Sequence, residues 1–514
     1  ERTGVAQGMS GSPVYFDGRL AGAVAFTWPF AQEPIAGITP IGAMRDLSRS
    51  EGASAASRGG PSVDVVALVG RTVPPTFASD LVTELTAAGN LPQGARGLSW
   101  VVSGLGLRPD LLAAAAGPGE WRSGGRNEDL GEEALVGGAA VAAVLIEGDL
   151  QLAAVGTVTE RYGDEILAFG HPFLGAGTVR VPMAPAEVVT VLASRETSFK
   201  IGNVGAVVGA FDQDRLAGVH GRIGLTAPTV PLEMVVHAGR RKTYHMGIAP
   251  VPQLIPGLLA AAVQGGMEAV GSSQGVRGIE LSARFEVGGR EPLELRDSFT
   301  GSGSGAELVS FLAASARFLQ RNPFEDVEIE KIHLELVLSQ EERSASLVAV
   351  RPETLRPRAG RPLRLDLELV PFRGRRFIRQ VTVELPGDLP SGRYTVLVGD
   401  GRSVDRARLA MEPARPANLG QALDLLGSLH SRRQLVVLGS MPTEGLRVVG
   451  ELLPRLPPSI RSLWTSGPPL PAVDAWILRS EVHELAIEDV GLPFQGLARL
   501  ALDVRRGAVE GEGS

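Results

Sequence analysis

A glycine-rich turn near the start of the chain holds a serine in a pattern suited to acyl transfer. The segment reads Gly8-Met9-Ser10-Gly11-Ser12-Pro13. Acyl transfer needs an exposed nucleophile and two backbone N–H groups that point to where the oxyanion develops. Gly8 lets the backbone fold so that its own N–H and that of Ser10 converge, and Gly11 keeps bulk away from the hydroxyl. The pattern therefore predicts Ser10 as a nucleophile, with Gly8 and Ser10 as the oxyanion donors.

An ordinary Gly/Ser turn between two strands would use the same residue types. Ser12 is the weaker nucleophile candidate, because at its position this turn needs only a small spacer. The residues that follow favour the catalytic interpretation. Pro13 fixes the exit into a strand, Asp17-Gly18 predicts a type I′ hairpin turn, and a strand of small residues begins at Gly22.

A histidine at the end of an apolar strand is the second candidate. The strand Ile166 to Phe169 runs into Gly170-His171-Pro172. A histidine held beside a glycine at a strand end can reach a serine on a neighbouring element and accept its proton. The alternative is a histidine that is simply packed or solvent-facing. We take His171 as the candidate general base.

Both segments resemble the SpoIVB-type serine peptidases, a family of the chymotrypsin-like clan. The resemblance spans about residues 1–45 and 135–225, and weaker similarity occurs at Gly202 to Gly205 and Gly218 to Gly221. It rests on the Ser10 hexapeptide, on Pro34 to Ile41, on Val155 to Thr159 and on Ala168 to His171. Membership would imply Ser10 as nucleophile, His171 as general base, Gly8 and Ser10 as oxyanion donors, and no cofactor.

The chain departs from the family in two respects. In the family the histidine precedes the serine, whereas here Ser10 comes first, so either the barrel is permuted in sequence order or residues before Glu1 complete it. The family's triad acid lies shortly before the serine, a region that this sequence does not contain. Asp212 and Asp214 follow His171 and are the alternative candidates for that acid, although such a run is also typical of a solvated turn.

Composition limits the classes of function. The net charge of -7 gives no general attraction to nucleic acid or anionic membranes. The absence of cysteine excludes disulfides, a thiol nucleophile and Cys-ligated zinc. No run of residues reaches the roughly 18 apolar residues of a membrane-spanning helix. His220, His237 and His245 lack the close spacing of metal ligands, so we expect neither a metal nor a cofactor.

The pattern of the chain predicts a mainly β protein with some α-helix and several domains. With 514 residues, 65 glycines and 36 prolines, short strands and tight turns are favoured over long helices. We expect four parts: a chymotrypsin-like, peptidase-like barrel region over 1–300 with linkers near 48–62 and 117–131, a connecting helix over 301–324, an Ig-like β-sandwich over 325–412, and a small mixed α/β region over 413–514.

Two of these parts carry more detailed expectations. Ser304 to Glu307 has the form of a capping box at the start of the connecting helix. In the sandwich, Leu365, Leu367 and Leu369 should point inward together, with the acidic residues between them, Asp366 and Glu368, facing solvent.

Two hypotheses for function follow. The first is a serine endopeptidase-like protein of the bacterial cell envelope, extracytoplasmic, acting on protein or peptide substrates through an acyl-enzyme and able to cleave itself. The second is a non-catalytic binding or scaffold protein derived from a peptidase, which fits the missing acid and the inverted order. Because the chain opens on Glu1 without a methionine, we expect a fragment or a processed product.

Overall fold

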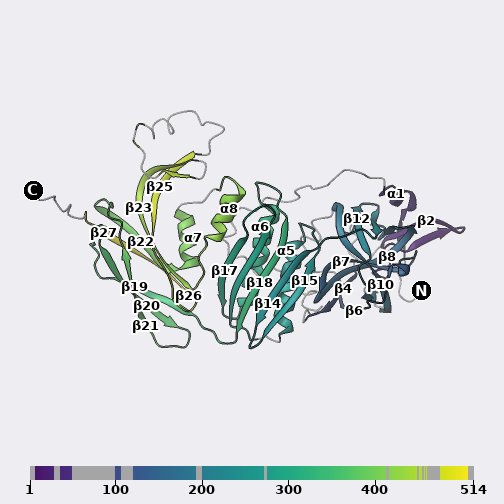
Figure 1. Ribbon diagram of the computed structural model, residues 1–514, viewed down its shortest axis with the longest axis horizontal. Coiled ribbons are helices and arrows are strands. Elements are labelled where there is room, and N and C mark those ends of the chain that lie inside the picture. The colour runs from purple at the N-terminus through teal and green to yellow at the C-terminus, as the bar shows by residue number, and fades with distance from the viewer. Residues whose placement is uncertain are drawn as a thin grey trace, which may run out of the picture.

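The computed structural model describes residues 6–27, 35–48, 99–105, 120–192, 199–270, 275–411, 416–448, 451–453, 457, 459 and 475–506. They form an elongated molecule with a barrel at the N-terminal end, a sheet with helices in the middle and a sandwich toward the C-terminus (Figure 1). The expected mainly β fold class is confirmed. Within these ranges, no helix combines the length and apolar character that crossing a membrane requires.

Six antiparallel strands close into a barrel. In chain order they are β7 (Ala140–Gly148), β8 (Leu150–Tyr162), β9 (Glu165–Ala168), β10 (Gly177–Leu192), β12 (Gly209–Arg215) and β13 (Gly218–Ile223). Around the barrel the order is β7, β8, β9, β13, β12, β10 and back to β7. Phe169 and Phe211 pack edge to face inside it, with ring centroids 5.9 Å apart. This closed barrel is the frame that carries His171.

A small outer layer covers one side of the barrel. Its strands are β4 (Ser99–Gly104), β5 (Glu120–Ser123), β6 (Gly125–Arg126) and β11 (Phe199–Val204), and a 3-10 turn, η1 (Glu132–Ala134), follows. Alternate residues of β7 therefore enter two cores, Val141 and Ala143 inside the barrel and Ala142 and Val144 under the outer layer. Burial on both faces explains the unbroken apolar run of β7.

One of the two expected linkers contributes strands to this outer layer. Part of the 117–131 stretch forms the strands β5 and β6, so it is not simply a linker. The other expected linker, 48–62, lies outside the described residues apart from Ser48.

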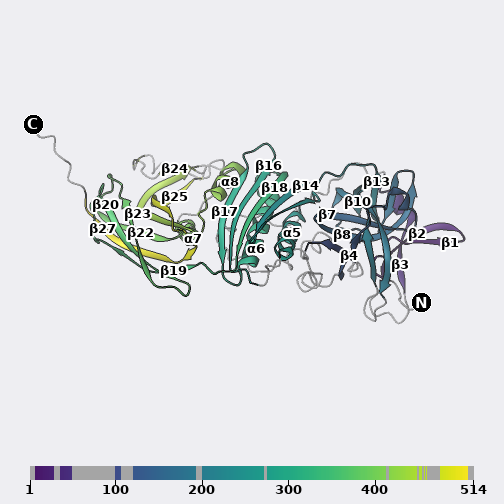
Figure 2. The same cartoon turned by 60° about the horizontal axis from the view of Figure 1, so that its bottom comes forward.

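The Ser10 segment adds a separate three-stranded sheet beside the barrel (Figure 2). Its strands are β1 (Pro13–Phe16), β2 (Arg19–Thr27) and β3 (Ala36–Pro40), followed by α1 (Ile41–Arg45). The expected hairpin is confirmed: Asp17 and Gly18 have φ of 46° and 73°, as a type I′ turn requires. Ala23 and Met44 pack with Leu167 of β9, which fixes this sheet against the barrel.

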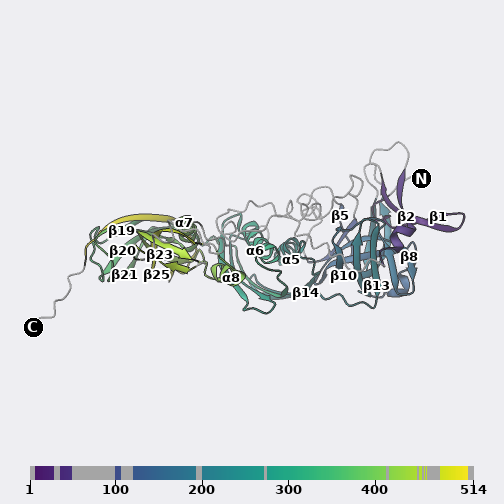
Figure 3. The same ribbon diagram turned by 90° about the horizontal axis from the view of Figure 1, so that it is seen from above.

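The middle of the molecule extends the sheet of the barrel. The added strands are β14 (Val230–His237), β15 (Arg241–Ile248), β16 (Gly278–Val287), β17 (Leu293–Thr300) and β18 (Ile329–Ser339), in the order β7, β15, β14, β18, β16, β17. The helices α5 (Ile255–Ala269) and α6 (Ser304–Arg321) cover one face (Figure 3). The connecting helix is thus present as α6, but its capping box does not form, because the N-cap is Gly303 and the buried Ser304 hydroxyl has no partner in the described part of the chain.

The sandwich is larger than the sequence predicts. One sheet contains β19 (Ala345–Pro352), β20 (Pro362–Pro371), β21 (Phe377–Glu384) and β26 (Phe494–Gln495); the other contains β22 (Gly392–Asp400), β23 (Gln434–Val448), β24 (Glu451–Leu453), β25 (Ala475–Asp489) and β27 (Leu497–Val504). The two sheets share one hydrophobic core. The helix α7 (Gly401–Met411) packs against β22 and β23, whereas α8 (Leu419–Gly427) packs against β17 of the middle sheet. The expected limits of 325–412 differ from this unit at both ends. At the start, β18 pairs with β14 and β16 of the middle sheet; at the end, β22 pairs with β23 and β27, which lie beyond residue 412.

The expected faces of β20 are confirmed for the leucines and wrong for one acid. Leu365, Leu367 and Leu369 are all buried in the sandwich core. Glu368 is buried as well, because Arg351 and Arg376 cover it, with N–O distances of 3.2 and 2.6 Å. The outer face of this strand is thus covered by arginine side chains at Glu368, whereas Asp366 is half-buried and Arg364 is exposed.

Candidate functional site

The structure brings the two predicted residues into contact. Ser10 Oγ and His171 Nε2 are 2.8 Å apart, although 161 positions separate them in the sequence. Ser10 lies in the turn before β1, and His171 lies in the loop between β9 and β10. Ser10 is half-buried and His171 is buried, with 7% of its surface exposed. A hydroxyl and an imidazole at hydrogen-bond distance satisfy the first geometric requirement of a nucleophile and its base.

Two consecutive turns shape the serine segment. The first is closed by the Met9 N–H, which donates to the Ala6 carbonyl at 3.1 Å, and the second by the Ser12 N–H, which donates to the Met9 carbonyl at 2.8 Å. Gly8 and Gly11 are the third residues of these turns, with φ of 86° and 94°. Such positive φ at the third position is typical of type II turns and favours glycine. The G-x-S-G pattern is therefore a requirement of the backbone, with the serine as second residue of the second turn.

The carbonyl groups of this segment are anchored to β8. The Ser10 carbonyl accepts the Thr157 N–H, and the Gly8 carbonyl accepts the Thr157 hydroxyl, both at 2.8 Å. The Thr159 hydroxyl donates to the Gly11 carbonyl at 2.7 Å. Two buried threonines on one face of a barrel strand thus hold the carbonyls of Gly8, Ser10 and Gly11 toward the barrel.

The other backbone groups of the segment are also paired. The Gly11 N–H donates to the Val24 carbonyl at 2.7 Å, and the Val24 N–H returns a bond to the Ser12 carbonyl at 2.9 Å. The Gln7 carbonyl accepts the Lys200 N–H at 3.3 Å. β2 and β11 therefore hold the two flanks of the turn.

Two backbone groups between Gln7 and Ser12 stand apart. Within the part of the chain that the structure describes, the N–H groups of Gly8 and Ser10 donate to no protein acceptor. Gly8 is buried and Ser10 half-buried, and backbone donors in such positions are usually paired, so these two need an explanation. They are the two groups that the sequence predicts as oxyanion donors.

The protonation state of His171 follows from its neighbours. Nδ1 lies 2.7 Å from the Pro172 carbonyl oxygen. Because a carbonyl only accepts, Nδ1 carries the hydrogen, and Nε2 is left to accept from the Ser10 hydroxyl. Burial lowers the pKa of His171 below the ordinary histidine value, against a smaller opposing effect of the Pro172 carbonyl. The imidazole is therefore neutral at neutral pH, as a general base must be.

Two residues with a left-handed backbone conformation set the direction of His171. Phe169 and Gly170 both have φ of 65°, which is uncommon for a phenylalanine. The Phe169 ring is fully buried, and the Thr39 hydroxyl donates to the Gly170 carbonyl at 2.5 Å. A Cβ on Gly170 would lie 2.9 Å from the Val24 carbonyl oxygen. The Phe-Gly-His sequence thus lets the loop turn sharply and press against the Ser10 sheet.

Asp214 organises the loop after His171. Its carboxylate accepts the backbone N–H groups of Phe173, Leu174 and Ala176 at 2.7, 2.5 and 3.4 Å. Burial raises the pKa of Asp214 to about 6, and these amides counteract part of that effect. Within the described ranges it makes no hydrogen bond to the imidazole, so the structure places it as a support of the loop.

Asp212 belongs to a different cluster. Its carboxylate lies 2.6 Å from His220 Nδ1 and accepts from Arg222 Nε at 3.1 Å. Burial alone would raise the pKa of Asp212, but His220 and Arg222 together lower it below its ordinary value. Neither acid candidate is therefore joined to His171, and among the described residues no cluster of three His, Asp or Glu could hold a metal ion.

Three residues that touch the Ser10 turn were given no role from the sequence: Thr157, Thr159 and Lys200. The available signal was two threonines two positions apart, which share one face of the strand β8; both are 1% exposed in the structure. Lys200 Nζ donates to Thr157 Oγ1 at 3.1 Å, and burial lowers the pKa of this lysine. For Lys200 the only signal in the sequence was that lysine is rare, since the chain contains just three lysines.

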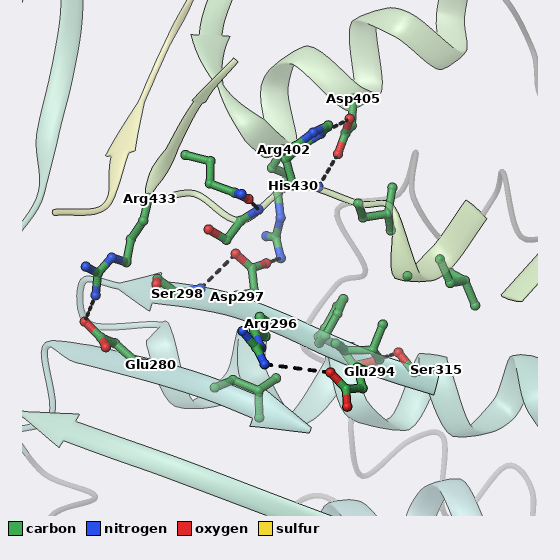
Figure 4. Close-up of a pocket in the computed structure, with 18 of the residues that line it drawn as sticks. Glu280, Glu294, Arg296, Asp297, Ser298, Ser315, Arg402, Asp405, His430 and Arg433 are labelled. Atoms are coloured by element: carbon green, nitrogen blue, oxygen red, sulfur yellow. Dashed lines mark hydrogen bonds and ion pairs between the residues drawn. The ribbon is translucent and has the colours of Figure 1, made fainter. Parts of the chain in front are cut away.

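A second polar region lies far from the dyad. A cleft of about 680 Å³ is lined by β16, β17, α6, α7, α8 and the residues before β23. Figure 4 shows that its charged side chains face one another in pairs. Arg402 binds Asp297 at 2.7 Å, and His430 lies 2.9 Å from Asp405. Ion pairs across this cleft, such as that of Arg402 with Asp297, therefore connect the C-terminal part to the middle sheet.

Comparison with models of protein families, with curated proteins and with solved structures finds no match to this chain. The resemblance to SpoIVB-type peptidases thus rests on the sequence motifs alone. The site consists of a serine, a neutral histidine and two amides for which the described residues provide no acceptor.

Proposed function

We propose that this protein is a serine endopeptidase-like protein of the bacterial cell envelope, which cleaves protein or peptide substrates, itself included, through an acyl-enzyme. One observation carries the proposal. Ser10 Oγ lies 2.8 Å from His171 Nε2, in the turn whose Gly8 and Ser10 N–H groups have no acceptor among the described residues. A nucleophile, a base and paired oxyanion donors are what acyl transfer requires.

The reaction follows from these groups. Ser10 Oγ attacks the peptide carbonyl carbon while His171 Nε2 takes the hydroxyl proton, and the oxyanion is bound by the Gly8 and Ser10 amides. The C–N bond then breaks as His171 returns the proton to the leaving amine. Water, deprotonated by His171, hydrolyses the Ser10 ester. No cofactor is needed.

The Pro172 carbonyl takes the orienting role that a carboxylate has in a triad. It fixes the tautomer of His171 and its dipole stabilises the imidazolium that forms. A carbonyl carries no net charge, so it stabilises the imidazolium less than a carboxylate would. We therefore expect a slower enzyme than one with a complete triad.

The barrel supports the resemblance to chymotrypsin-like peptidases. Numbered in chain order, its six strands are arranged 1-2-3-6-5-4, and His171 follows the third strand. That order is similar to the barrels of the chymotrypsin-like clan. Ser10 comes from a separate sheet that precedes the barrel in the chain, which is how a permuted arrangement would bring the serine before the histidine.

Turnover of casein and of the chain itself tests the proposal. Ser10→Ala removes the nucleophile with little change in volume, and it should lower the rate about 10⁴- to 10⁶-fold. Ser12→Ala is the matched control and should cost far less. Equal turnover in the wild type and Ser10→Ala, at matched folded concentration, would refute the assignment of the nucleophile.

The non-catalytic scaffold remains the second candidate, because the described residues place no carboxylate against His171. A scaffold would show no turnover in the wild type, and its binding would not change in Ser10→Ala.

A further inference from the structure

A half-buried lysine lies directly behind the oxyanion turn. Lys200 of β11 donates its backbone N–H to the Gln7 carbonyl, and its side-chain Nζ lies 3.1 Å from Thr157 Oγ1. Its aliphatic carbons cover Gly8: a Cβ placed on that glycine would lie 3.1 Å from Lys200 Cδ. The lysine therefore touches the turn through its backbone, its stem and, by way of Thr157, its ammonium group.

The hydrogen bonds of this group have a fixed direction. An ammonium group only donates, so Thr157 Oγ1 is the acceptor from Lys200. The single hydroxyl hydrogen of Thr157 is then free to donate to the Gly8 carbonyl, 2.8 Å away. The result is a chain from ammonium to hydroxyl to carbonyl, in which each bond polarises the next.

This series of hydrogen bonds acts on the Gly8 amide, one of the two for which no described residue is an acceptor. The carbonyl and the N–H of Gly8 lie on either side of the same α-carbon. Because glycine has no Cβ, side-chain sterics do not hold its backbone at the observed φ of 86°. Anchoring the carbonyl limits the rotation that would turn the N–H away from the oxyanion. A positive charge behind the turn also favours negative charge in front of it.

We propose that Lys200 is a positioning residue of the oxyanion site, acting through Thr157 on Gly8; this rests on the proposed serine-peptidase function. Lys200 is not the base, because the Ser10 hydroxyl is already paired with His171. Methionine is close to lysine in length and keeps an apolar stem over Gly8, so Lys200→Met removes the charge with little loss of packing.

The test uses the full chain and a fluorophosphonate probe, whose phosphoryl oxygen occupies the oxyanion site as Ser10 reacts. We expect Lys200→Met to lower the second-order labelling rate about tenfold, less than the 10²- to 10³-fold cost of losing an oxyanion donor outright. The melting temperature should not fall. Lys242→Met, on an exposed hairpin, is the matched control and should label at the wild-type rate.

A double mutant checks that Lys200 acts through Thr157. Thr157→Val should slow labelling at least as much as Lys200→Met, and the double variant should be no slower than Thr157→Val alone. Independent, multiplying effects would overturn the proposal. If Lys200→Met does not fold, Thr157→Ser, which keeps the hydroxyl, should label faster than Thr157→Val, and equal rates would overturn it too.

Failure of this inference can be told from failure of the proposed function. A wild type that does not react with the probe removes the peptidase proposal itself. A wild type that reacts, with Lys200→Met reacting equally fast, removes only the role of Lys200.

Discussion

The Ser10 turn and the charged cleft between the middle sheet and the C-terminal part are both polar, but they are satisfied in opposite ways. In the cleft, Asp297 meets Arg402 and Glu280 meets Arg433, so charge is matched by charge (Figure 4). Beside the Ser10 turn His171 is neutral, and within the turn the amides of Gly8 and Ser10 have no acceptor among the described residues. Groups left unpaired are available for a substrate, whereas paired ones hold the protein together.

This contrast separates activity from stability. Truncating the Ser10 or His171 side chain should reduce reaction rates with small effects on folding, because the backbone hydrogen bonds that hold the turn are kept. Changes in the cleft should reduce the free energy of unfolding and leave the reaction rate unchanged. The predictions below test the contrast, beginning with the largest effect.

Removing the base should have the largest effect on rate. His171→Ala leaves the Ser10 hydroxyl without a proton acceptor, and loss of a triad member typically costs about 10⁴-fold or more. Labelling by the fluorophosphonate, followed by gel fluorescence, measures the loss. His237→Ala, which removes a half-exposed contact with Glu335, is the control and should react normally. Comparable labelling of the two variants would mean that His171 is not the base.

Distorting the turn should have the next largest effect. A Cβ on Gly11 would lie 2.0 Å from the Thr157 carbonyl oxygen, and the φ of 94° disfavours any side chain. Gly11→Ala must therefore shift the turn from β8, and we expect a rate loss of about 10²- to 10³-fold, comparable to losing an oxyanion donor. Gly18→Ala tests a glycine with φ of 73° but open space around it. If Gly11→Ala were as active as Gly18→Ala, the turn geometry would not matter for the reaction.

Substitutions in the cleft should change the free energy of unfolding and leave the labelling rate unchanged. Asp297→Ala leaves Arg402 without its 2.7 Å partner and removes the acceptor of the Arg432 N–H. Breaking a buried pair costs about 3 kcal/mol of unfolding free energy, measured by denaturant titration. Arg296→Ala, an exposed neighbour on β17, should change it by less than about 0.5 kcal/mol. A loss of labelling rate in correctly folded Asp297→Ala would contradict the separation of the two regions.

The pH dependence should show the smallest and most specific effect. The base works only when neutral, so the labelling rate falls as pH drops through the pKa of His171. Burial lowers that pKa from the ordinary value of 6.5, and the midpoint of the acid limb should therefore lie below pH 6.5. A rate profile from about pH 4 to pH 9 locates it. A midpoint above 6.5 would mean that the imidazole is stabilised in its charged form, contrary to its buried setting.

The sequence predicts local features well because they depend on neighbours in the chain. The Asp17-Gly18 hairpin, the α6 helix and the Ser10 turn all follow from short patterns with a backbone cause. The proximity of Ser10 and His171 was expected from a family resemblance and could not follow from spacing alone.

The features that the sequence did not predict depend on distant partners. Lys200 looks like any other lysine until β11 places it beside Gly8. Asp214 was a candidate for the triad acid, but the loop it holds exists only once the barrel has closed. β18 alternates as a sandwich strand would, and which sheet it joins is decided by its pairing with β14 and β16.

Locating the site of covalent reaction tests the central claim most directly. In a fluorophosphonate reaction, Ser10 Oγ would form a bond to phosphorus, fluoride would leave, and His171 would take the hydroxyl proton. After proteolytic digestion of the labelled full chain, mass spectrometry identifies the modified residue. The account predicts one adduct, on Ser10, that disappears in Ser10→Ala and persists in Ser12→Ala. An unmodified folded protein, or an adduct on Ser12 or any other residue, would contradict it.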